Sequence, residues 1–330
     1  FSSIIFYPVM YSFEALTKLF AEKFRDKRFS GAVPSLYEPA EYFLSLGGKR
    51  VRPVLCLMGN ELFGQIHPDA WHVANAVELF HNFTLIHDDI MDKAVIRRGK
   101  PTVHAKYGEP TALLSGDVMM IMAYEYLSKV SPVYLHKLLA IFNKMAKEIC
   151  EGQQLDMEFE KRSDVTLDEY IHMITLKTSV LLAASLQMGA LLGGSGEGNQ
   201  EHLYAFGKNL GIAFQLQDDY LDAFGEPEKF GKQPGGDILA NKKTFLVIKA
   251  LEVADAAQKA ALLAHFSGNK PDKVEQVLQL FRDCKIDHWA QELKNKYLDT
   301  ALFHLDEAAV TTIRKEPLRD LAHFLIRRQY

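Results

Sequence analysis

The amino-acid sequence predicts an all-α fold. Most segments place apolar residues at the three- and four-residue spacing of an amphipathic helix, and the alternation typical of a strand is nearly absent. Several central segments, such as 180–184 and 211–214, are apolar around most of their circumference, which is typical of helices buried inside a bundle. No change of composition and no long flexible linker divides the chain. We therefore expect a single domain over residues 1–330, a bundle of roughly 12 to 14 helices.

Length, composition and charge narrow the class of protein. A chain of 330 residues, 48% of them apolar, can bury a large core. Its 38 basic and 42 acidic residues give a net charge of −4, so the basic excess typical of nucleic-acid binding is missing and no nucleic-acid partner is expected. The cysteines Cys56, Cys150 and Cys284 show no metal-ligand spacing and are expected to be reduced thiols of a cytoplasmic protein.

No segment predicts insertion into a membrane. The longest apolar run, 180–192, is interrupted by Ser185 and Gln187 and is shorter than a membrane span. Residues 1–10 are apolar, but they lack the basic start and the small-residue cleavage site of a signal peptide. We therefore expect neither an integral membrane protein nor a targeting segment.

The first part of the chain predicts two helices, over 11–29 and 35–46, followed by a glycine turn. Directly after the turn, Lys49, Arg50 and Arg52 place three cations close together, a pattern that fits an anion-binding site. The later helices are expected over residues 54–63, 69–95, 110–129, 133–161, 167–193, 197–225, 244–253, 256–266, 272–284, 287–303 and 317–328.

An acidic cluster and a basic cluster meet at the end of the helix expected over 69–95. Asp88 and Asp92 stand four residues apart and would project from one helix face, and Arg97 and Arg98 follow just beyond the helix. Taken alone, such a cluster is more often a solvated helix face. Here the preceding turns are mostly apolar, so the carboxylates emerge from a buried helix and need a cationic partner.

A second acidic cluster, Asp218, Asp219 and Asp222, has the same internal spacing and again follows an apolar stretch, 210–217. Two such carboxylate groups indicate one shared metal site. Mg²⁺ prefers oxygen ligands and commonly binds through a few carboxylates and substrate phosphates. A dinuclear iron site would need Glu-x-x-His pairs on helices, and the sequence offers none that would support it.

Together these motifs resemble those of the trans-isoprenyl diphosphate synthases. The resemblance is carried by the two acidic motifs and by several shorter matches that occur in family order: Asp88–Asp92, Arg97–Thr102 and Asp218–Asp222, with Gly47–Pro53, Lys177-Thr178, Gly231-Lys232 and Gly236–Ile238. It implies the isoprenoid synthase fold, with a central cavity, and a head-to-tail prenyl transfer. In that reaction an allylic diphosphate is ionised with the help of Mg²⁺, isopentenyl diphosphate attacks the allylic cation, and a proton is lost.

The resemblance also implies roles for individual residues. The metal ligands would be Asp88, Asp92 and Asp218, with Asp89 and Asp222 as further candidates, and they would hold three Mg²⁺ ions once diphosphate is bound. The allylic diphosphate would contact Arg97, Lys177, Thr178, Gln215 and Lys232. Isopentenyl diphosphate would contact Lys49, Arg52, His81 and Arg98, which Arg50 could join.

Some of these residues also have an ordinary structural interpretation. Thr178 and Gln215 match positions whose oxygens face the developing cation in the family, although Thr and Gln are common polar residues of helices. Arg327 and Arg328 are either cations favoured at a helix C-terminus or a tail that closes over the isopentenyl site. The family further implies a homodimer and an allylic substrate that is dimethylallyl, geranyl or farnesyl diphosphate.

The residues before the first acidic motif bear on product length. The family uses the fifth position before the first Asp as a marker, and here it is Phe83; with the small Thr84 next to it, the pattern is most like that of archaeal-type geranylgeranyl diphosphate synthases. A helical wheel instead places Thr84 beneath Asp88 and Phe83 more than a third of a turn away. Geranylgeranyl diphosphate is the expected product, with farnesyl or longer-chain diphosphates as alternatives.

Two other functions compete with prenyl transfer. A class I terpene cyclase also binds Mg²⁺ through aspartates in a helical bundle, but it takes one diphosphate, so Lys49, Arg52, His81 and Arg98 would be surplus. A non-catalytic partner subunit would be expected to carry degraded acidic motifs, whereas both motifs are intact here.

Overall fold

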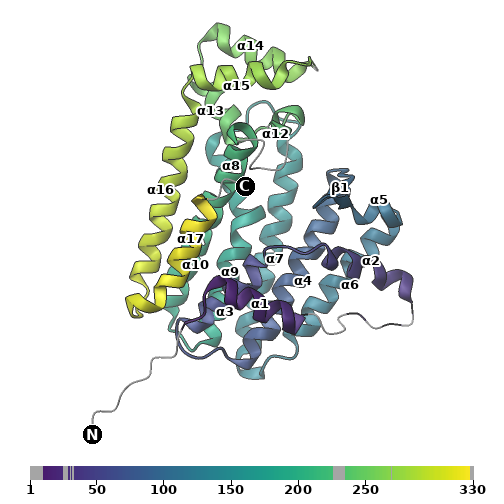
Figure 1. Cartoon of the computed structure of the whole chain (residues 1–330), viewed down its shortest axis with the longest axis vertical. Coiled ribbons are helices and arrows are strands. Elements are labelled where there is room, and N and C mark those ends of the chain that lie inside the picture. The colour runs from purple at the N-terminus through teal and green to yellow at the C-terminus, as the bar shows by residue number, and fades with distance from the viewer. Residues whose placement is uncertain are drawn as a thin grey trace. The chain divides into compact units, whose positions relative to one another are not determined.

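A computed structural model of the chain describes residues 10–24, 29, 31, 33–225, 235–268 and 270–327. Within these residues there are sixteen α-helices, one π-helix and one two-stranded ribbon (Figure 1), which confirms the all-α prediction. The helices outnumber those expected, partly because α5 (Val103–Tyr107) and α12 (Gly236–Leu239) are too short to show helical periodicity.

The chain packs into two compact units, each built from three separate segments. Unit 1 comprises Phe1–Asn143, Ala184–Tyr204 and Ala308–Leu318. Unit 2 comprises Lys144–Ala183, Ala205–Glu307 and Arg319–Tyr330. No single cut in the sequence separates the units, and the expected single domain stays a prediction.

The helices fall into three sets by unit. Unit 1 holds α1 (Phe13–Phe24), α2 (Pro34–Ser45), α3 (Val51–Glu61), α4 (Pro68–Met91), the strands β1 (Ile96–Arg97) and β2 (Lys100–Pro101), α5, and α6 (Glu109–Leu127). Unit 2 holds α8 (Leu167–Ile174), the π-helix η1 (Thr175–Ser179), α12, α13 (Phe245–Val253), α14 (Ala256–Ser267), α15 (Lys273–Asp283) and α16 (Ile286–Glu307). Four further helices contribute residues to both units: α7 (Pro132–Phe159), α9 (Val180–Leu192), α10 (Glu197–Phe224) and α17 (Thr312–Arg327).

In unit 1 the helices α4 and α6 lie side by side (Figure 1). Helix α4 begins at Pro68, where the fixed backbone of proline suits the first helical position, and the preceding His67 side chain accepts a hydrogen bond from the amide of Asp69. Gly116 on α6 faces His87 on α4 so closely that a β-carbon at this glycine would overlap the imidazole ring. The small residue therefore sets the close approach of the two helices.

Helix α4 ends at Met91, four residues earlier than expected. The reason is a tight turn, because Lys93 adopts a left-handed backbone with φ of 52°. The chain then forms the hairpin of β1 and β2, whose turn residues Arg98 and Gly99 also have positive φ values of 52° and 73°. Each strand has only two residues, which is too few for an alternating pattern, so sequence reasoning missed the hairpin.

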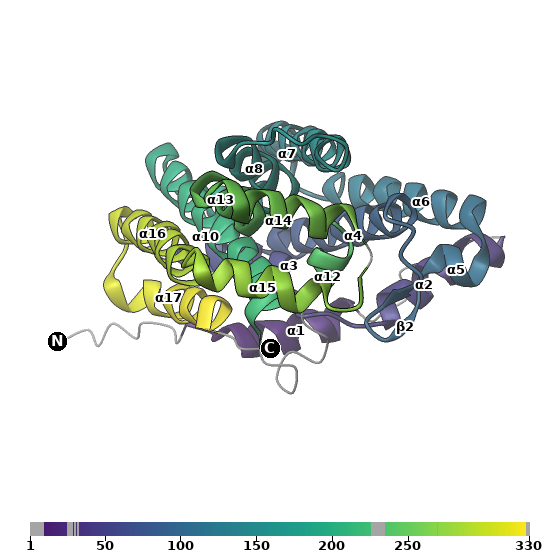
Figure 2. The same cartoon turned by 90° about the horizontal axis from the view of Figure 1, so that it is seen from above.

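In unit 2 a hydrophobic core forms between α8, α10 and the helices α13 to α16, with Phe245 and Phe281 almost fully buried. Helices α14 and α15 pack against each other and against α13 (Figure 2). The side chains that begin α8 and α14, Thr166 and Asp255, each form a capping box with the residue three positions later. These local signals fix where both helices start.

The helix expected over 167–193 is present, whereas the last helix begins earlier than expected. The segment Leu167–Leu192 is the one helix among the described residues that is long and apolar enough to cross a membrane, but 78% of its apolar window is buried, as in the core helix of a bundle. Helix α17 begins at Thr312 and so contains Pro317, which had been expected at the helix start. Among the described residues, Cys56, Cys150 and Cys284 are not joined to one another by a disulfide.

Candidate functional site

Four arginines of unit 1 surround one histidine. We call this set, Arg50, Arg52, Arg97 and Arg98 together with His81, the arginine cluster. Burial, followed by the charges of the four arginines, holds the pKa of His81 well below its usual value. The imidazole is therefore neutral at pH 7 and lies in a strongly positive environment.

Two arginines of the cluster have a carboxylate partner. Arg50 forms an ion pair with the buried Glu78 and also donates to the carbonyl of Leu44 at 3.1 Å. Arg97 donates from Nε to both oxygens of Asp89 at 2.9 and 2.8 Å, and a second nitrogen of Arg97 lies 2.7 Å from Asp89 Oδ1. Asp89 is buried, and both of its oxygens bind Arg97. This pair depends on the hairpin, which returns β1 toward the end of α4.

For the other two arginines the structure shows no carboxylate partner among the described residues. Arg98 donates to the carbonyl of Gly47, and its guanidinium packs against Gly48, where a β-carbon would lie 3.1 Å away. Arg52 Nε is buried and has no hydrogen-bond partner in the described part of the chain. Burial and the nearby Arg98 lower the pKa of Arg52 to about 10, although Glu78 opposes the shift. A buried guanidinium with an unmet donor among like charges is suited to an anion.

The structure thus brings together Arg52, His81 and Arg98, three of the four residues predicted to bind isopentenyl diphosphate. The fourth, Lys49, is exposed in the turn between Gly48 and Arg50. The left-handed backbone of Arg50, with φ of 51°, begins α3 directly after this turn. Arg50 itself is matched by Glu78, so its first role is to hold the turn against α4.

Asp88 and Asp92 lie at the C-terminal end of α4. Asp88 is half-buried and Asp92 is exposed, and the amide of Asp92 donates to the carbonyl of Asp88 at 2.8 Å. The C-terminal end of a helix carries a partial negative charge, so two carboxylates there reinforce an environment that favours cations. This arrangement fits the predicted role of both residues as metal ligands.

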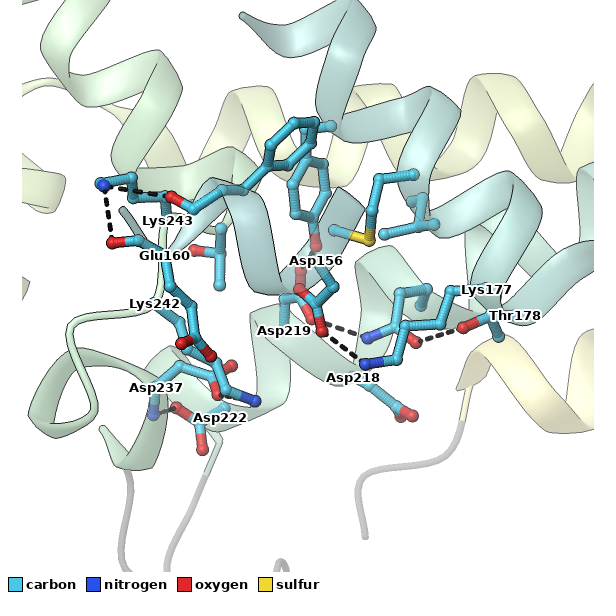
Figure 3. A pocket seen from close by; sticks show the side chains of 16 residues that line it. Asp156, Glu160, Lys177, Thr178, Asp218, Asp219, Asp222, Asp237, Lys242 and Lys243 are labelled. Carbon is cyan, nitrogen blue, oxygen red and sulfur yellow. Dashed lines mark hydrogen bonds and ion pairs between the residues drawn. The ribbon is translucent and has the colours of Figure 1, made fainter. Parts of the chain in front are cut away.

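Unit 2 contains a cavity of about 480 Å³, which we call the acidic cavity (Figure 3). It is bounded by α7, α8, η1, α10, α12 and the segment before α13. Its charged lining consists of six acidic and three basic side chains: Asp156, Glu160, Asp218, Asp219, Asp222 and Asp237, with Lys177, Lys242 and Lys243. Thr178 and Gln215 also line it. Five residues with a predicted role therefore meet here: Lys177, Thr178 and Gln215 for the allylic diphosphate, and Asp218 and Asp222 for the metal.

The π-helix η1 presents Lys177 and Thr178 to the cavity. Lys177 forms an ion pair with Asp156 of α7, and Thr178 Oγ1 donates to Gln215 Oε1 at 3.3 Å (Figure 3). Helix α7 approaches this point at Gly152, where a β-carbon would overlap the backbone of Lys177. A wide helical turn of this kind is often found at functional sites.

The three aspartates of the second motif have different environments. Asp218 lines the cavity and is half-buried. Asp219 is buried and accepts hydrogen bonds from the Tyr170 hydroxyl and from Gln215 Nε2, and burial, together with the nearby Asp237, raises its pKa. Asp222 Oδ2 accepts from the amide of Asp237 at 2.8 Å, which ties the end of α10 to the start of α12.

Magnesium fits both acidic regions by the chemistry of their donors. The side chains at the end of α4 and in the acidic cavity offer carboxylate oxygens, and the cavity lining contains neither histidine nor cysteine. Among the described residues, no three His, Cys, Asp or Glu side chains are gathered closely enough to hold a metal by themselves. Because Mg²⁺ keeps several waters and takes other ligands from substrate phosphates, an incomplete protein shell suits it.

Sequence reasoning missed four charged residues of the cavity: Asp156, Glu160, Lys242 and Lys243. Asp156 pairs with Lys177, and Lys242 lies 3.5 Å from Asp237. Lys242 follows the Gly236-Asp237 match by a few residues, so its charge next to Lys243 was a usable signal. Asp156 is one of many polar residues on α7 and gave none. Lys232, predicted to bind the allylic diphosphate, lies outside the described residues, as does Arg328.

The residues expected to set product length lie on α4. The ring of Phe83 makes edge contacts with Phe80 and His87 at centroid distances of 5.4 and 4.8 Å. His87 Nε2 lies 3.2 Å from the carbonyl oxygen of Leu113 on α6, so Phe83 lies on the α6 side of α4. Thr84 is half-buried, and its hydroxyl donates to the carbonyl of His81 at 2.8 Å. Met119 is fully buried, as expected for packing.

Several known proteins are similar to this chain in sequence and in structure. The family model Polyprenyl synthetase matches residues 33–284. A geranylgeranyl diphosphate synthase of Sulfolobus acidocaldarius is 39% identical, over 91% of this chain and 93% of that protein. A crystal structure of a geranylgeranyl pyrophosphate synthase superposes with a TM-score of 0.92 at 43% identity, covering 97% of this chain and all of that one. A polyprenyl synthase from Caulobacter crescentus, complexed with calcium and isoprenyl diphosphate, superposes with a TM-score of 0.85 at 28% identity, with 96% of each chain covered. The chain therefore belongs to the polyprenyl synthetase family.

Proposed function

We propose that the protein is a trans-prenyltransferase that condenses isopentenyl diphosphate with an allylic diphosphate and releases geranylgeranyl diphosphate. The observation that carries the proposal is the arginine cluster with the unmatched donor of Arg52, because it supplies an anion site in addition to the acidic regions. A terpene cyclase, which takes one diphosphate, would not need it. Relatives named geranylgeranyl diphosphate synthase support the proposal.

The arginine cluster would bind isopentenyl diphosphate. Arg52 and Arg98 would donate to its phosphate oxygens, with Lys49 at the exposed edge. His81, which is neutral, would donate a hydrogen bond from its ring N–H without changing its charge. Binding here requires no bond to form or break, so this region positions the nucleophile.

The allylic diphosphate would be held by metal ions and by basic side chains. Asp88, Asp92 and Asp218 would hold three Mg²⁺ ions, with Asp89 and Asp222 as weaker candidate ligands. When bound, these ions would neutralise the negative charge of the leaving diphosphate. Lys177, Lys242, Arg97 and Lys232 would donate to its phosphate oxygens. Support for a metal-bound diphosphate comes from the Caulobacter relative, which holds calcium and isoprenyl diphosphate.

In the reaction the allylic carbon–oxygen bond breaks and the diphosphate leaves with the electron pair. The double bond of isopentenyl diphosphate then forms the new carbon–carbon bond to the allylic cation. The released diphosphate accepts the proton that leaves. Thr178 and Gln215 would turn their oxygens toward the cation, which stabilises it electrostatically.

Three wider features complete the proposal. We place the enzyme in the cytoplasm. We expect a homodimer, and the support is an apolar surface on α6 where Leu114 is 59% and Ile121 54% exposed, as at a face that a second copy would cover. We expect a product of twenty carbons because an aromatic Phe83 next to a small Thr84 is the pattern of geranylgeranyl diphosphate synthases.

Incubation of the purified protein with Mg²⁺, labelled isopentenyl diphosphate and each allylic primer in turn tests the proposal. Chromatography of the dephosphorylated products should show geranylgeraniol as the main species. The matched control omits Mg²⁺ and should yield no product. No elongation of any primer would contradict prenyl transfer, whereas a product of another length would contradict the chain-length assignment alone.

A further inference from the structure

Asp219 is the one aspartate of the second motif that is buried; Asp218 and Asp222 are half-buried. Asp219 is only 6% exposed, and both of its oxygens already have partners. Oδ2 accepts from the hydroxyl of Tyr170 on α8, and Oδ1 accepts from Gln215 Nε2 at 2.9 Å (Figure 3). These contacts occupy the carboxylate within the protein.

The bond from Gln215 determines which way its amide group points. A side-chain amide has a donor end and an acceptor end, and only the donor end can bind a carboxylate oxygen. Gln215 Oε1 is therefore left on the side of Thr178, whose hydroxyl donates to it at 3.3 Å. Both Gln215 and Thr178 line the acidic cavity.

The direction of this amide matters for a cationic intermediate. An amide oxygen directed at a developing positive charge stabilises it, whereas the NH₂ group in the same place would repel it. Without an acceptor behind Gln215, rotation by half a turn would exchange the two ends at little cost. Tyr170 holds Asp219 from the other side, which keeps this acceptor in place.

We propose that Asp219, braced by Tyr170, is a positioning residue that orients the Gln215 amide so that its carbonyl oxygen faces the allylic cation. The inference rests on the proposed prenyl transfer. It gives the middle aspartate of the second motif a role distinct from that of Asp218. Asp219 acts only through Gln215, so its contribution depends on the glutamine being present.

A double-mutant cycle in steady-state kinetics tests this dependence. Asp219→Leu, which removes the acceptor at nearly constant volume, should lower kcat by about ten- to a hundredfold, with less than a twofold change in KM for either diphosphate, because the lost interaction serves the cation. Tyr170→Phe should lower kcat in the same direction by a smaller factor. In a Gln215→Leu background, Asp219→Leu should change kcat less than twofold. Equal losses in both backgrounds would overturn the inference.

A binding measurement separates orientation from general damage. Isothermal titration with Mg²⁺ compares an unreactive thiolodiphosphate analogue of the allylic substrate with an ammonium analogue that mimics the cation. Asp219→Leu should weaken binding of the ammonium analogue by about tenfold and leave binding of the thiolodiphosphate analogue unchanged; equal weakening of both overturns the inference. If Asp219→Leu does not fold, Tyr170→Phe carries the same comparison. Glu61→Gln, which changes a buried carboxylate of unit 1, is the control and should change neither affinity.

The wild type distinguishes the two ways in which the inference can fail. A wild type that elongates primers and binds both analogues, with variants that behave alike toward both, refutes the positioning role and leaves prenyl transfer standing. A wild type that neither turns over nor binds either analogue refutes prenyl transfer, and the positioning role is refuted with it.

Discussion

The arginine cluster of unit 1 and the acidic cavity of unit 2 use charge in opposite ways. In the cluster the carboxylates Glu78 and Asp89 each bind an arginine, and the surplus charge is positive. In the cavity Lys177 is bound by Asp156, and the lining has twice as many acidic as basic side chains. In each region, side chains of the less common charge hold side chains of the more common charge in place. The surplus then indicates the ligand, which is an anion in the cluster and a cation, or an anion that brings cations, in the cavity.

Removing a carboxylate that is predicted to bind metal should have the largest effect on activity. Asp218→Ala is expected to lower kcat/KM at least about a thousandfold, since charge stabilisation of the leaving group is lost. Asp88→Ala should behave alike. Circular dichroism should show an intact helical bundle for both variants. The control Asp299→Ala, on an exposed part of α16, should keep its activity. Full activity of either site variant would remove that residue from the metal site.

Removing a cation from the arginine cluster should lower activity less and should affect one of the two substrates selectively. Arg52→Met is expected to raise KM for isopentenyl diphosphate about a hundredfold, because a charge-assisted phosphate contact is lost, and to change KM for the allylic diphosphate little.

The same variant should raise the free energy of unfolding by about 1 kcal/mol, since a buried donor without a partner disappears. Urea unfolding measures the second effect. Binding loss together with a loss of stability would mean that Arg52 serves the fold and not a ligand.

Product length should respond to apolar residues and leave both charged regions working. Phe83→Ala should give products longer than twenty carbons at a cost of about 3 kcal/mol in stability, because the ring packs against Phe80 and His87. Thr84→Phe should shorten the product to farnesyl diphosphate. Chromatography of the chain lengths decides between the two positions. An unchanged product from Phe83→Ala would favour the helical-wheel argument over the family marker.

The smallest effect concerns pH. Since the pKa of His81 is depressed in the folded state, the unfolded chain binds a proton near pH 6.5 that the folded chain does not. Stability is therefore unaffected above this pH and falls as the pH drops below it, with a slope of up to about 1.4 kcal/mol per pH unit.

Between pH 5 and 6.5, the urea midpoint of His81→Gln should depend less on pH than that of the wild type. The same pH dependence in both proteins would show that the pKa of His81 is not lowered in the folded state.

The motifs were predictable from sequence because each is a short run of charges beside apolar helices. Asp88, Asp92, Asp218 and Arg52 were identified in this way, whereas the role of His81 was implied by the resemblance to the family. What the sequence did not reveal is how charges are shared between segments. The bond between Asp89 and Arg97 depends on a six-residue hairpin, 96–101, whose two-residue strands give no strand signal.

The cavity shows the same limit for residues that are distant in the chain. Asp156, Lys242 and Asp237 reach it from three separate elements, and only packing brings them together. Asp219 looked like its neighbour Asp218 in sequence, yet Asp219 is buried and accepts a hydrogen bond from Tyr170, whereas Asp218 is half-buried.

The π-helix of residues 175–179 has a consequence for engineering this protein. A π-turn holds one residue more than an α-turn, so it can be regarded as a one-residue insertion in a continuous helix. Deleting a single residue there would restore regular α-helical bonding and would turn every preceding side chain by about 100° relative to those that follow. The altered protein would have a more regular helix but would direct Lys177 and Thr178 elsewhere. Redesign for thermal stability should therefore leave this irregular turn unchanged.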